Sequence, residues 1–463
     1  MSVEDHFDLI VIGSGPAGQK AAVQAAKAGK RVAMVERDRY VGGACVHRGT
    51  IPSKTLRESA VLLSHLHKNP ELFSFSLCDE LEMESLIERM DIVVRAHDEY
   101  INKQIKRHNI SYIHGRAKFI DAHTIDVAHV AGGKERFSAD FFVIATGSLP
   151  RNPPEIPIDH EHVFDSDSIL SMIYLPKSLI VLGGGVIASE YASIFATLGV
   201  NVTMIDRFER PLCFLDSDLT DKFVHAFTEL GGEFVGDSHV VSVTWNDISS
   251  VVVKLKDGSE FMAEKLLCAA GRVANVNGLG INNIGIELDS EGLLPINENY
   301  QTVVPNIYAA GDVIGHPSLA PVATEEGRRA VCHALGLDIG KVFREMPLAI
   351  YGIPEIASVG LSEQQANEKY GKCLVGRANF DETARGLISG IQDGMLKLIA
   401  DAKGEKLLGV QIVGEGATEL VHIGQMALIH DASIDAFIEN IFNFPTLAEA
   451  YRVAALHVKG QID

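Results

Sequence analysis

Two runs of the chain combine residue types that suit one kind of chemistry, the binding of a dinucleotide. Closely spaced glycines begin at Gly13 and Gly183, and an acid follows 23 residues later in each run, at Glu36 and Asp206. Glycine permits a tight turn and lets a pyrophosphate approach the backbone, and a carboxylate can accept hydrogen bonds from ribose hydroxyls. We therefore expect two separate dinucleotide sites.

A strand, a glycine turn, a helix and a second strand are the elements expected to position these groups. This order fits residues 7–36 in the first run and 178–206 in the second. A helix that begins directly after the turn offers free N–H groups and the positive end of its dipole to phosphates. The repeat therefore predicts an α/β fold with two nested Rossmann-like domains.

The remaining segments indicate how the chain divides. A polar stretch at 55–107 is predicted to be a helical insertion, and strands of a small meander are expected at 113–130 and 135–145. The proline-rich run after Ser148 is a predicted domain crossing, and strands and helices alternate after Pro347. The predicted domains are 1–150 and 275–342 for the first dinucleotide fold, 151–274 for the second, and 343–463 for a C-terminal α+β domain.

Composition argues against several classes of function. The chain of 463 residues has 41 Lys and Arg against 61 Asp and Glu, a net charge near −20, which disfavours nucleic acid or an anionic membrane as partner. No apolar run approaches the roughly 20 residues that span a bilayer, and no signal peptide is recognised, so we expect a cytoplasmic protein. The six cysteines form no CxxC pair and the histidines show no metal-ligand spacing, so no metal is expected. The cysteines other than Cys45 are expected to fill the core.

Further motifs resemble the flavoprotein disulfide reductases, such as dihydrolipoamide dehydrogenase and glutathione reductase. Residues 41–54, Val-Gly-Gly-Ala-Cys-Val-His-Arg-Gly-Thr-Ile-Pro-Ser-Lys, resemble the redox-active segment of that family. The motifs at 145–147, 271–272, 307–312 and 351–363 follow in the family's order. The resemblance covers essentially the whole chain and implies FAD on the first dinucleotide fold, a nicotinamide nucleotide on the second, and dimerisation through the C-terminal domain.

Two departures from that family argue against thiol chemistry. The family carries two thiols five positions apart, and here the first is Cys45 but the second position is Thr50. The family's C-terminal histidine, an acid/base for the departing thiol, is replaced by Phe444. Dithiol–disulfide exchange needs a thiol pair and benefits from a base. The sequence therefore argues against a disulfide reductase of this type.

One branch, the soluble (Si-specific) pyridine-nucleotide transhydrogenases, is similar in these respects. The matching segments are 49–54, 165–170 (Asp-Ser-Asp-Ser-Ile-Leu) and 442–455 (Phe-Asn-Phe-Pro-Thr-Leu-Ala-Glu-Ala-Tyr-Arg-Val-Ala-Ala). Arg48 departs from the branch, where an aromatic residue is expected, and this bears on the tuning of the flavin site. The resemblance implies an enzyme that transfers a hydride between NADPH and NAD⁺ in a ping-pong cycle through FAD.

The resemblance also implies roles for individual residues. Lys54 is expected to lie against the reactive edge of the flavin and to pair with Glu190, so that its charge stabilises negative charge on the ring. Asp312 is expected to bond the ribityl chain. The expected catalytic group is Cys45, Thr50, Lys54 and Glu190. The expected FAD-binding residues are Gly13, Gly15, Pro16, Gly18, Glu36, Arg37, Gly42, Gly43, Lys54, Ala117, Thr146, Gly147, Asp312, Leu319 and Ala320. The expected residues of the nicotinamide-nucleotide site are Gly183, Gly185, Val186, Ile187, Glu190, Asp206, Arg207, Gly271 and Arg272. By the same resemblance, Pro445, Thr446 and Glu449 reach the flavin site of the partner subunit in a homodimer.

Nucleotide preference and acceptor stay open in the sequence. Asp206 suits the free 2′-hydroxyl of NAD(H), whereas Arg207 and Arg210 could hold a 2′-phosphate. One alternative is therefore an NADH-dependent reductase whose acceptor is a quinone or oxygen. Another is a flavoprotein redox sensor without catalysis, against which the Lys54 and Glu190 pair argues, because binding alone does not require it.

Overall fold

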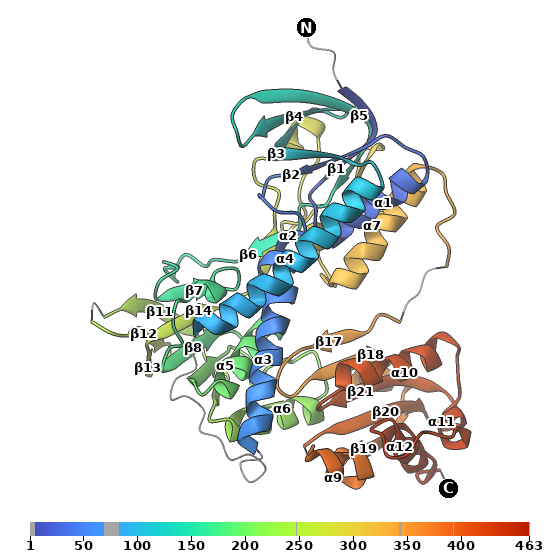
Figure 1. Cartoon of the computed structure of the whole chain (residues 1–463). Helices are drawn as coiled ribbons and strands as arrows, with labels where there is room; N and C mark the ends of the chain where they lie inside the picture. Colours follow the sequence, from blue (N-terminus) through green and yellow to red (C-terminus); the bar gives the residue numbers. More distant parts are fainter. Residues whose placement is uncertain (1–4, 69–82, 247, 342–344, 392, 463) are drawn as a thin grey trace.

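A computed structural model describes residues 5–68, 83–246, 248–341, 345–391 and 393–462. Figure 1 shows two sheet-containing regions formed by about the first three quarters of the chain and a third, C-terminal region coloured orange to red. We call these the first unit, the second unit and the C-terminal domain. In the part of the chain that the structure describes, no helix is both long and apolar enough to cross a membrane.

The first unit is built on a six-stranded sheet whose strands come from distant parts of the sequence. The central pairs β1–β2, β1–β5, β2–β3 and β5–β16 are parallel. The strands are β1 (Asp5–Ile12), β2 (Val32–Glu36), β3 (Ser111–Asp121), β4 (Thr124–His129), β5 (Lys134–Ile144) and β16 (Ile307–Ala309).

Strands β3 and β5 each take part in two kinds of pairing. Residues 111–114 of β3 pair in parallel with β2, and residues 115–121 pair antiparallel with β4. Strand β5 joins β4 through residues 134–138 and β1 through 137–144. The predicted meander is therefore confirmed, and it is continuous with the parallel sheet rather than separate from it.

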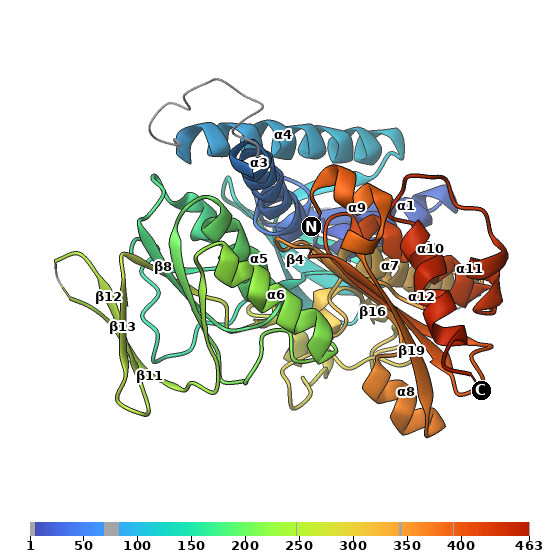
Figure 2. The ribbon, with the colours of Figure 1, turned by 90° about the horizontal axis from the view of Figure 1, so that it is seen from below.

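Helices cover this sheet and extend from it. Helices α1 (Pro16–Lys27) and α7 (Ala320–Ala334) pack closely, because a Cβ at Gly327 would lie 2.2 Å from the carbonyl oxygen of Ala17. The predicted insertion contains α3 (Thr50–Lys68) and the long α4 (Met83–Arg107), with residues 69–82 outside the described part. The short helix α2 (Gly43–His47) precedes them. Figure 2 shows α3 and α4 crossing each other over one side of the molecule.

The second unit repeats the arrangement. Its five-stranded parallel sheet has the order β10-β9-β8-β14-β7. The strands are β7 (Val163–Asp165), β8 (Ser178–Leu182), β9 (Asn201–Ile205), β10 (Glu233–Val235) and β14 (Lys265–Cys268). Helices α5 (Val186–Thr197) and α6 (Ser217–Glu229) and an antiparallel sheet complete the unit. That sheet contains β11 (Val240–Trp245), β12 (Val251–Leu255) and β13 (Glu260–Ala263). Strands β6 (Ser148–Pro150) and β15 (Arg272–Ala274) pair where the chain passes between the units.

The C-terminal domain is an antiparallel sheet with helices, which confirms the predicted α+β pattern. Its strand order is β17-β18-β21-β20-β19. The strands are β17 (Leu348–Ile350), β18 (Ile356–Gly360), β19 (Cys373–Asn379), β20 (Met395–Asp401) and β21 (Leu407–Val413). The helices are α8 (Glu363–Tyr370), α9 (Ala384–Ser389), α10 (Ala417–Ile429), α11 (Asp435–Glu439) and α12 (Glu449–Lys459).

Two buried ion pairs hold the C-terminal domain against the units. Arg57 of α3 pairs with Glu355 at 2.9 Å, and Glu355 also accepts the backbone N–H of Thr418 at the start of α10. Lys397 of β20 lies 3.0 Å from Asp216, the residue that precedes α6. Because each pair joins elements remote in sequence, both constrain how the three regions meet.

Candidate functional site

The first glycine turn leaves open space for a phosphate at Gly15 but no space for a side chain at Gly13 or Gly18. Gly13 has φ +108°, and a Cβ there would lie 2.2 Å from the carbonyl oxygen of Ala145. A Cβ at Gly18 would lie 2.0 Å from the carbonyl oxygen of Gly13, whereas one at Gly15 would meet nothing within 4 Å. Helix α1 begins at Pro16 without a side-chain cap. Its free N–H groups therefore face the open side of the turn.

The acid of the first run is held by the same turn. One carboxylate oxygen of Glu36 accepts the backbone N–H and the hydroxyl of Ser14, at 2.8 and 2.6 Å. The other accepts the backbone N–H of Asp38 at 2.9 Å. The N–H of Gly42 bonds the Ser14 hydroxyl at 3.0 Å, so the 42–43 loop lies on the turn. The second oxygen, which accepts only this one hydrogen bond, can accept another, which a ribose hydroxyl could supply.

The second glycine turn is built around Asp206. A Cβ at Gly184 would lie 2.3 Å from a carboxylate oxygen of Asp206, which explains why that position has no side chain. The N–H of Arg207 donates to Asp206 at 2.9 Å. Burial raises the pKa of the Asp206 carboxyl, and the backbone N–H and charge of Arg207 oppose the rise. Arg210 is paired with Asp221 of α6, and the Arg207 guanidinium stacks over Phe208.

Lys54 and Glu190 are brought together as expected. The Lys54 Nζ, on α3, lies 2.5 Å from one carboxylate oxygen of Glu190, on α5. The other oxygen accepts the backbone N–H of Tyr351 at 2.8 Å, and Nζ lies 5.0 Å from the Tyr351 ring centre. Glu190 is buried and Lys54 is a quarter exposed. The pair stands where the first unit, the second unit and the C-terminal domain meet. Sequence reasoning missed Tyr351, although it opens a motif that had been singled out.

Cys45 is a lone thiol on α2. Burial raises the pKa of this thiol, and a hydrogen bond from Thr50 opposes the rise. A thiol with a raised pKa is mostly protonated and unreactive at neutral pH. The expectation that the other cysteines fill the core is wrong for Cys213, which is exposed, while Cys268 and Cys332 are buried. Cys78 lies outside the described residues.

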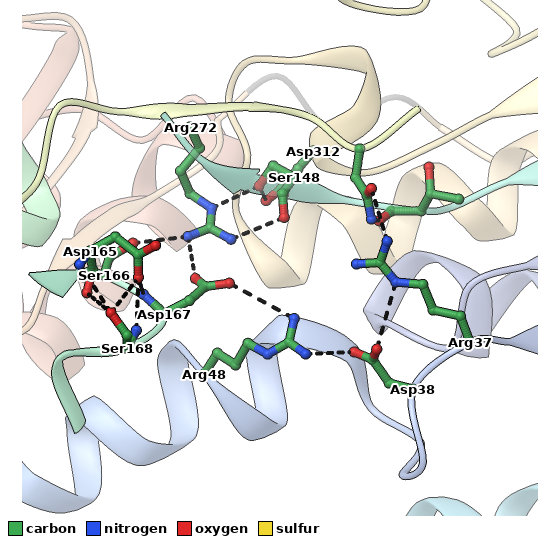
Figure 3. Close-up of polar contacts among 12 residues, drawn as sticks. Arg37, Asp38, Arg48, Ser148, Asp165, Ser166, Asp167, Ser168, Arg272 and Asp312 are labelled. Carbon is green, nitrogen blue, oxygen red and sulfur yellow. Dashed lines mark hydrogen bonds and ion pairs between the residues drawn. The ribbon is translucent and has the colours of Figure 1, made fainter. Parts of the chain in front are cut away.

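A chain of polar contacts links Asp312 to Arg272. The Ser148 hydroxyl donates to Asp312 at 2.6 Å, and the Arg272 Nε donates to that hydroxyl at 2.8 Å. Arg272 also donates to Ser166 and Asp167, so its guanidinium is largely engaged by the protein (Figure 3). Asp312 lies in a 3-10 helix (Asp312–Ile314). Sequence reasoning did not assign Ser148 or Asp167 to the site, although Asp167 lies in the quoted Asp-Ser-Asp-Ser segment.

The other expected residues fall around these groups. Arg37 donates to Asn275 at 3.3 Å, and Asn275 in turn donates to the carbonyl of Thr146. Helix α7 begins at Ala320, directly after Leu319, without a side-chain cap, so its N-terminus has free N–H groups. Ala117 is buried in β3. Positive φ angles occur at Gly42, Gly43, Gly147, Gly183 and Gly271. Gly185 precedes α5, and Val186 and Ile187 are the first two residues of that helix.

The expected dimer residues lie in the C-terminal domain. The N–H of Thr446 donates to Glu449 at 3.2 Å, and its hydroxyl donates to the carbonyl of Asn443. Phe444, before Pro445, is 74% exposed, and Ile441 is 91% exposed. Large apolar side chains this exposed are typical of a surface that another chain covers. No group of three His, Cys, Asp or Glu side chains suited to a metal occurs among the residues described.

Two dinucleotide folds joined by a Lys–Glu pair, whose glutamate is buried, define an oxidoreductase that uses two nucleotide cofactors. The chain belongs to the pyridine nucleotide-disulphide oxidoreductase family, whose model matches residues 7–327, and the dimerisation domain of the same family matches 346–455. Membership implies binding of FAD and a nicotinamide nucleotide, as well as dimerisation through the C-terminal domain. The predicted fold class is therefore confirmed.

Individual proteins of known name and individual solved structures are also similar to this chain. The soluble pyridine nucleotide transhydrogenase of Colwellia psychrerythraea is 41% identical over 97% of each chain. The one of Marinomonas sp. is 40% identical over 98% of each chain. The one of Mycobacterium bovis is 40% identical over 99% of this chain and 98% of its own. Among solved structures, LpdA from Mycobacterium tuberculosis has a TM-score of 0.90 at 27% identity, covering 98% of this chain and 99% of that one. The HOCl-induced flavoprotein disulfide reductase RclA of Escherichia coli has a TM-score of 0.88 at 27% identity, covering 97% and 100%.

The residues of the first unit fit FAD. The hydroxyl oxygen of Thr146 is buried and has no hydrogen-bond partner among the described residues, so it is available to a ligand. The open space at Gly15 and the uncapped N-termini of α1 and α7 suit a pyrophosphate and a polar ring edge.

Proposed function

We propose that the chain transfers a hydride from NADPH to NAD⁺ in a ping-pong cycle. FAD, when bound, supplies the hydride chemistry by accepting a hydride from one nicotinamide nucleotide and passing it to another. The observation that carries the proposal is the combination of an intact Lys54–Glu190 pair with Thr50 in place of a second thiol. The site retains the groups that polarise a cofactor and lacks those that exchange disulfides. The transhydrogenase relatives at 40% identity support the same conclusion.

Lys54 supplies a fixed positive charge in this proposal. The Glu190 carboxylate holds its ammonium group in place at 2.5 Å. The backbone N–H of Tyr351 in turn holds that carboxylate, because it donates to the other oxygen. A charge that is already oriented costs no reorganisation when negative charge develops next to it. Asp312, supported by Ser148, is the proposed acceptor for the ribityl hydroxyls. Cys45 and Thr50 are proposed to line the site as packing groups rather than to take part in electron transfer.

The second glycine turn is proposed to bind both nicotinamide nucleotides in succession. Asp206 suits the 2′-hydroxyl of NAD(H). Arg207 is exposed, and Arg210 is held by the exposed Asp221, so either guanidinium can turn to a 2′-phosphate at small cost. We assign residues 1–150 and 275–342 to the FAD domain and 151–274 to the nicotinamide-nucleotide domain. The remaining residues, 343–463, form the dimerisation domain, and the active enzyme is proposed to be a homodimer.

A reductase that passes electrons from NADH to another acceptor is the second candidate. Asp206 favours it, because a carboxylate beside the 2′ position repels a phosphate. A cavity of about 450 Å³ lies between α1 and α4 with Cys45 and Tyr100 in its lining, and it would give a quinone a place to bind.

Initial rates with NADPH and, separately, with NADH as donor distinguish the two candidates. Purified holoprotein is assayed anaerobically with a spectrally distinct NAD⁺ analogue and, separately, with a water-soluble quinone. A transhydrogenase gives parallel double-reciprocal lines with the NAD⁺ analogue and a rate at least comparable with that of the quinone. Transfer from NADH to the quinone that is faster by orders of magnitude than transfer from NADPH to the analogue would instead establish the reductase.

A further inference from the structure

Arg48 occupies a boundary position between the two dinucleotide units. It follows α2 directly, at the place where the resemblance led us to expect an aromatic residue. One guanidinium nitrogen lies 2.9 Å from Asp38 of the first unit, and the other lies 3.9 Å from Asp167. The side chain is 36% exposed. Figure 3 shows Arg48 reaching across the gap between the two acids.

Asp167 belongs to the second unit, and its loop is folded around a buried acid. Asp165, the last residue of β7, accepts the backbone N–H groups of Asp167 and Ser168 at 3.0 and 2.9 Å. The loop therefore presents Asp167 toward the first unit in a fixed orientation. One oxygen of Asp167 faces Arg48, and the other accepts a hydrogen bond from Arg272 at 2.8 Å.

The contact continues from Arg272 to the proposed flavin side of the site. Arg272 donates to Ser148, and Ser148 donates to Asp312. The line of contacts thus starts in the first unit at Asp38, enters the second unit at Asp167, and returns to the first unit at Asp312. The weakest contact in this line is the Arg48–Asp167 pair, because its nitrogen–oxygen distance of 3.9 Å is the longest and the Arg48 side chain is the most exposed.

We propose that Arg48 is a positioning residue that clamps the second unit to the first through Asp167. The clamp keeps Arg272 bonded to Ser148 and fixes the pose in which the second unit presents its nucleotide. The inference rests on the proposed function only in requiring that a nicotinamide nucleotide binds the second unit. Small errors in the pose of a reacting group reduce rates strongly. We therefore expect loss of the clamp to lower the rate of hydride delivery more than the affinity for nucleotide.

The test compares Arg48→Gln with Arg39→Gln. Arg39 is a matched control because it is exposed, lies in the loop that precedes α2, carries the same charge, and stacks on Tyr40 at 5.2 Å. Holoprotein is mixed anaerobically with NADPH and with NADH, and the limiting rate of flavin bleaching and the nucleotide Kd are measured. Arg48→Gln is expected to slow bleaching about three- to tenfold with a Kd changed less than twofold, and Arg39→Gln to match the wild type. Equal rates in the two variants would overturn the proposal.

Two further readouts separate the clamp from a general loss of structure. Hydrogen–deuterium exchange without nucleotide should be faster at residues 165–168 in Arg48→Gln and unchanged in Arg39→Gln. High salt should slow the wild type toward Arg48→Gln and leave the variant unaffected, because exposed ion pairs are screened. Unchanged exchange at 165–168 would contradict the clamp even if the rate fell.

A double-mutant cycle with Asp167→Asn completes the test. The two side chains act through one contact, so Arg48→Gln should add little to the effect of Asp167→Asn. Fully additive effects would mean that Arg48 acts elsewhere, for example through Asp38 alone. If NADH reduces the flavin and NADPH does not, the proposed transhydrogenase activity is refuted. The rate of flavin reduction by NADH would still test the clamp.

Discussion

Replacing Lys397 with methionine should destabilise the junction between the second unit and the C-terminal domain. The Lys397 side chain is 1% exposed, and its Nζ lies 2.9 to 3.0 Å from Asp216, Asp218 and Glu363. Arg377 also pairs with Asp218 and Glu363. The substitution keeps most of the side-chain volume but leaves three carboxylates with one cation, so the main effect is electrostatic.

The size of the effect follows from burial. Removing one partner of a buried ion pair costs about 3 to 5 kcal/mol of unfolding free energy, and the lower value applies because Arg377 remains. An unfolding entropy of about 2.1 cal/mol/K per residue gives about 1 kcal/mol/K for a chain of 463 residues, so the Tm should fall by about 3 °C.

The pH dependence gives the reasoning a second test. Burial alone lowers the pKa of Lys397, but the hydrogen bond to Glu363 and the charges of the two aspartates outweigh it and raise the pKa. A raised lysine pKa means that titration of the lysine itself removes this stabilisation only above the usual lysine range. The difference between wild type and variant should therefore be constant around neutral pH, and it should shrink as acid protonates the carboxylates.

Differential scanning fluorimetry measures both effects, with Lys406→Met as the control. Lys406 pairs with Asp431 at 3.4 Å and is 55% exposed, so its removal should change stability by about 1 kcal/mol or less. A Lys397→Met variant as stable as Lys406→Met would refute the argument from burial. So would a stability difference that grows as the pH is lowered.

Three other predictions address the site and the assembly. Alkylation of Cys45 should be slow at neutral pH and slower still in Thr50→Ala, because burial raises the thiol pKa and the hydrogen bond from Thr50 opposes the rise. Mass spectrometry of the adducts from neutral to alkaline pH measures the alkylation rate, and faster alkylation in Thr50→Ala would contradict the prediction. Asp221→Asn should free Arg210 and tighten NADPH binding up to about fivefold in calorimetry with little change for NADH, and equal effects on both nucleotides would show that Arg210 does not reach the 2′-phosphate. Phe444→Glu should shift the protein toward monomer in analytical ultracentrifugation, since it buries a charge in the proposed interface, and an unchanged dimer would place the interface elsewhere.

Local patterns were sufficient for the elements that carry the site. The strand, helix and strand predicted within 178–206 are confirmed as β8, α5 and β9, and the helix after the first turn is confirmed as α1. Each is an apolar run bounded by a glycine turn or an acid, so its ends are marked by residues with strong backbone preferences. The Lys54–Glu190 pair came from the family resemblance, since nothing local marks two residues on different helices as partners.

What the sequence could not predict are contacts between remote residues and strands with two roles. Strand β3 leaves a parallel sheet and enters an antiparallel meander without a break, because alternating side chains suit both pairings. Arg48 and Asp167, like Lys397 and Asp216, are far apart in the chain and meet only through the tertiary fold. Strands β17 and β19 were not predicted, because one is three residues long and the other contains Gly376.

The two half-reactions, run separately, test the central claim most directly. Holoprotein is treated anaerobically with one equivalent of NADPH, freed of nucleotide by gel filtration, and then mixed with NAD⁺. The proposed transhydrogenase should lose its flavin absorbance in the first step, and in the second it should recover that absorbance and form NADH in an amount equal to its FAD. If NADPH leaves the flavin oxidised while NADH bleaches it quickly, or if the NADPH-treated enzyme forms no NADH but reduces a quinone, the transhydrogenase account is wrong.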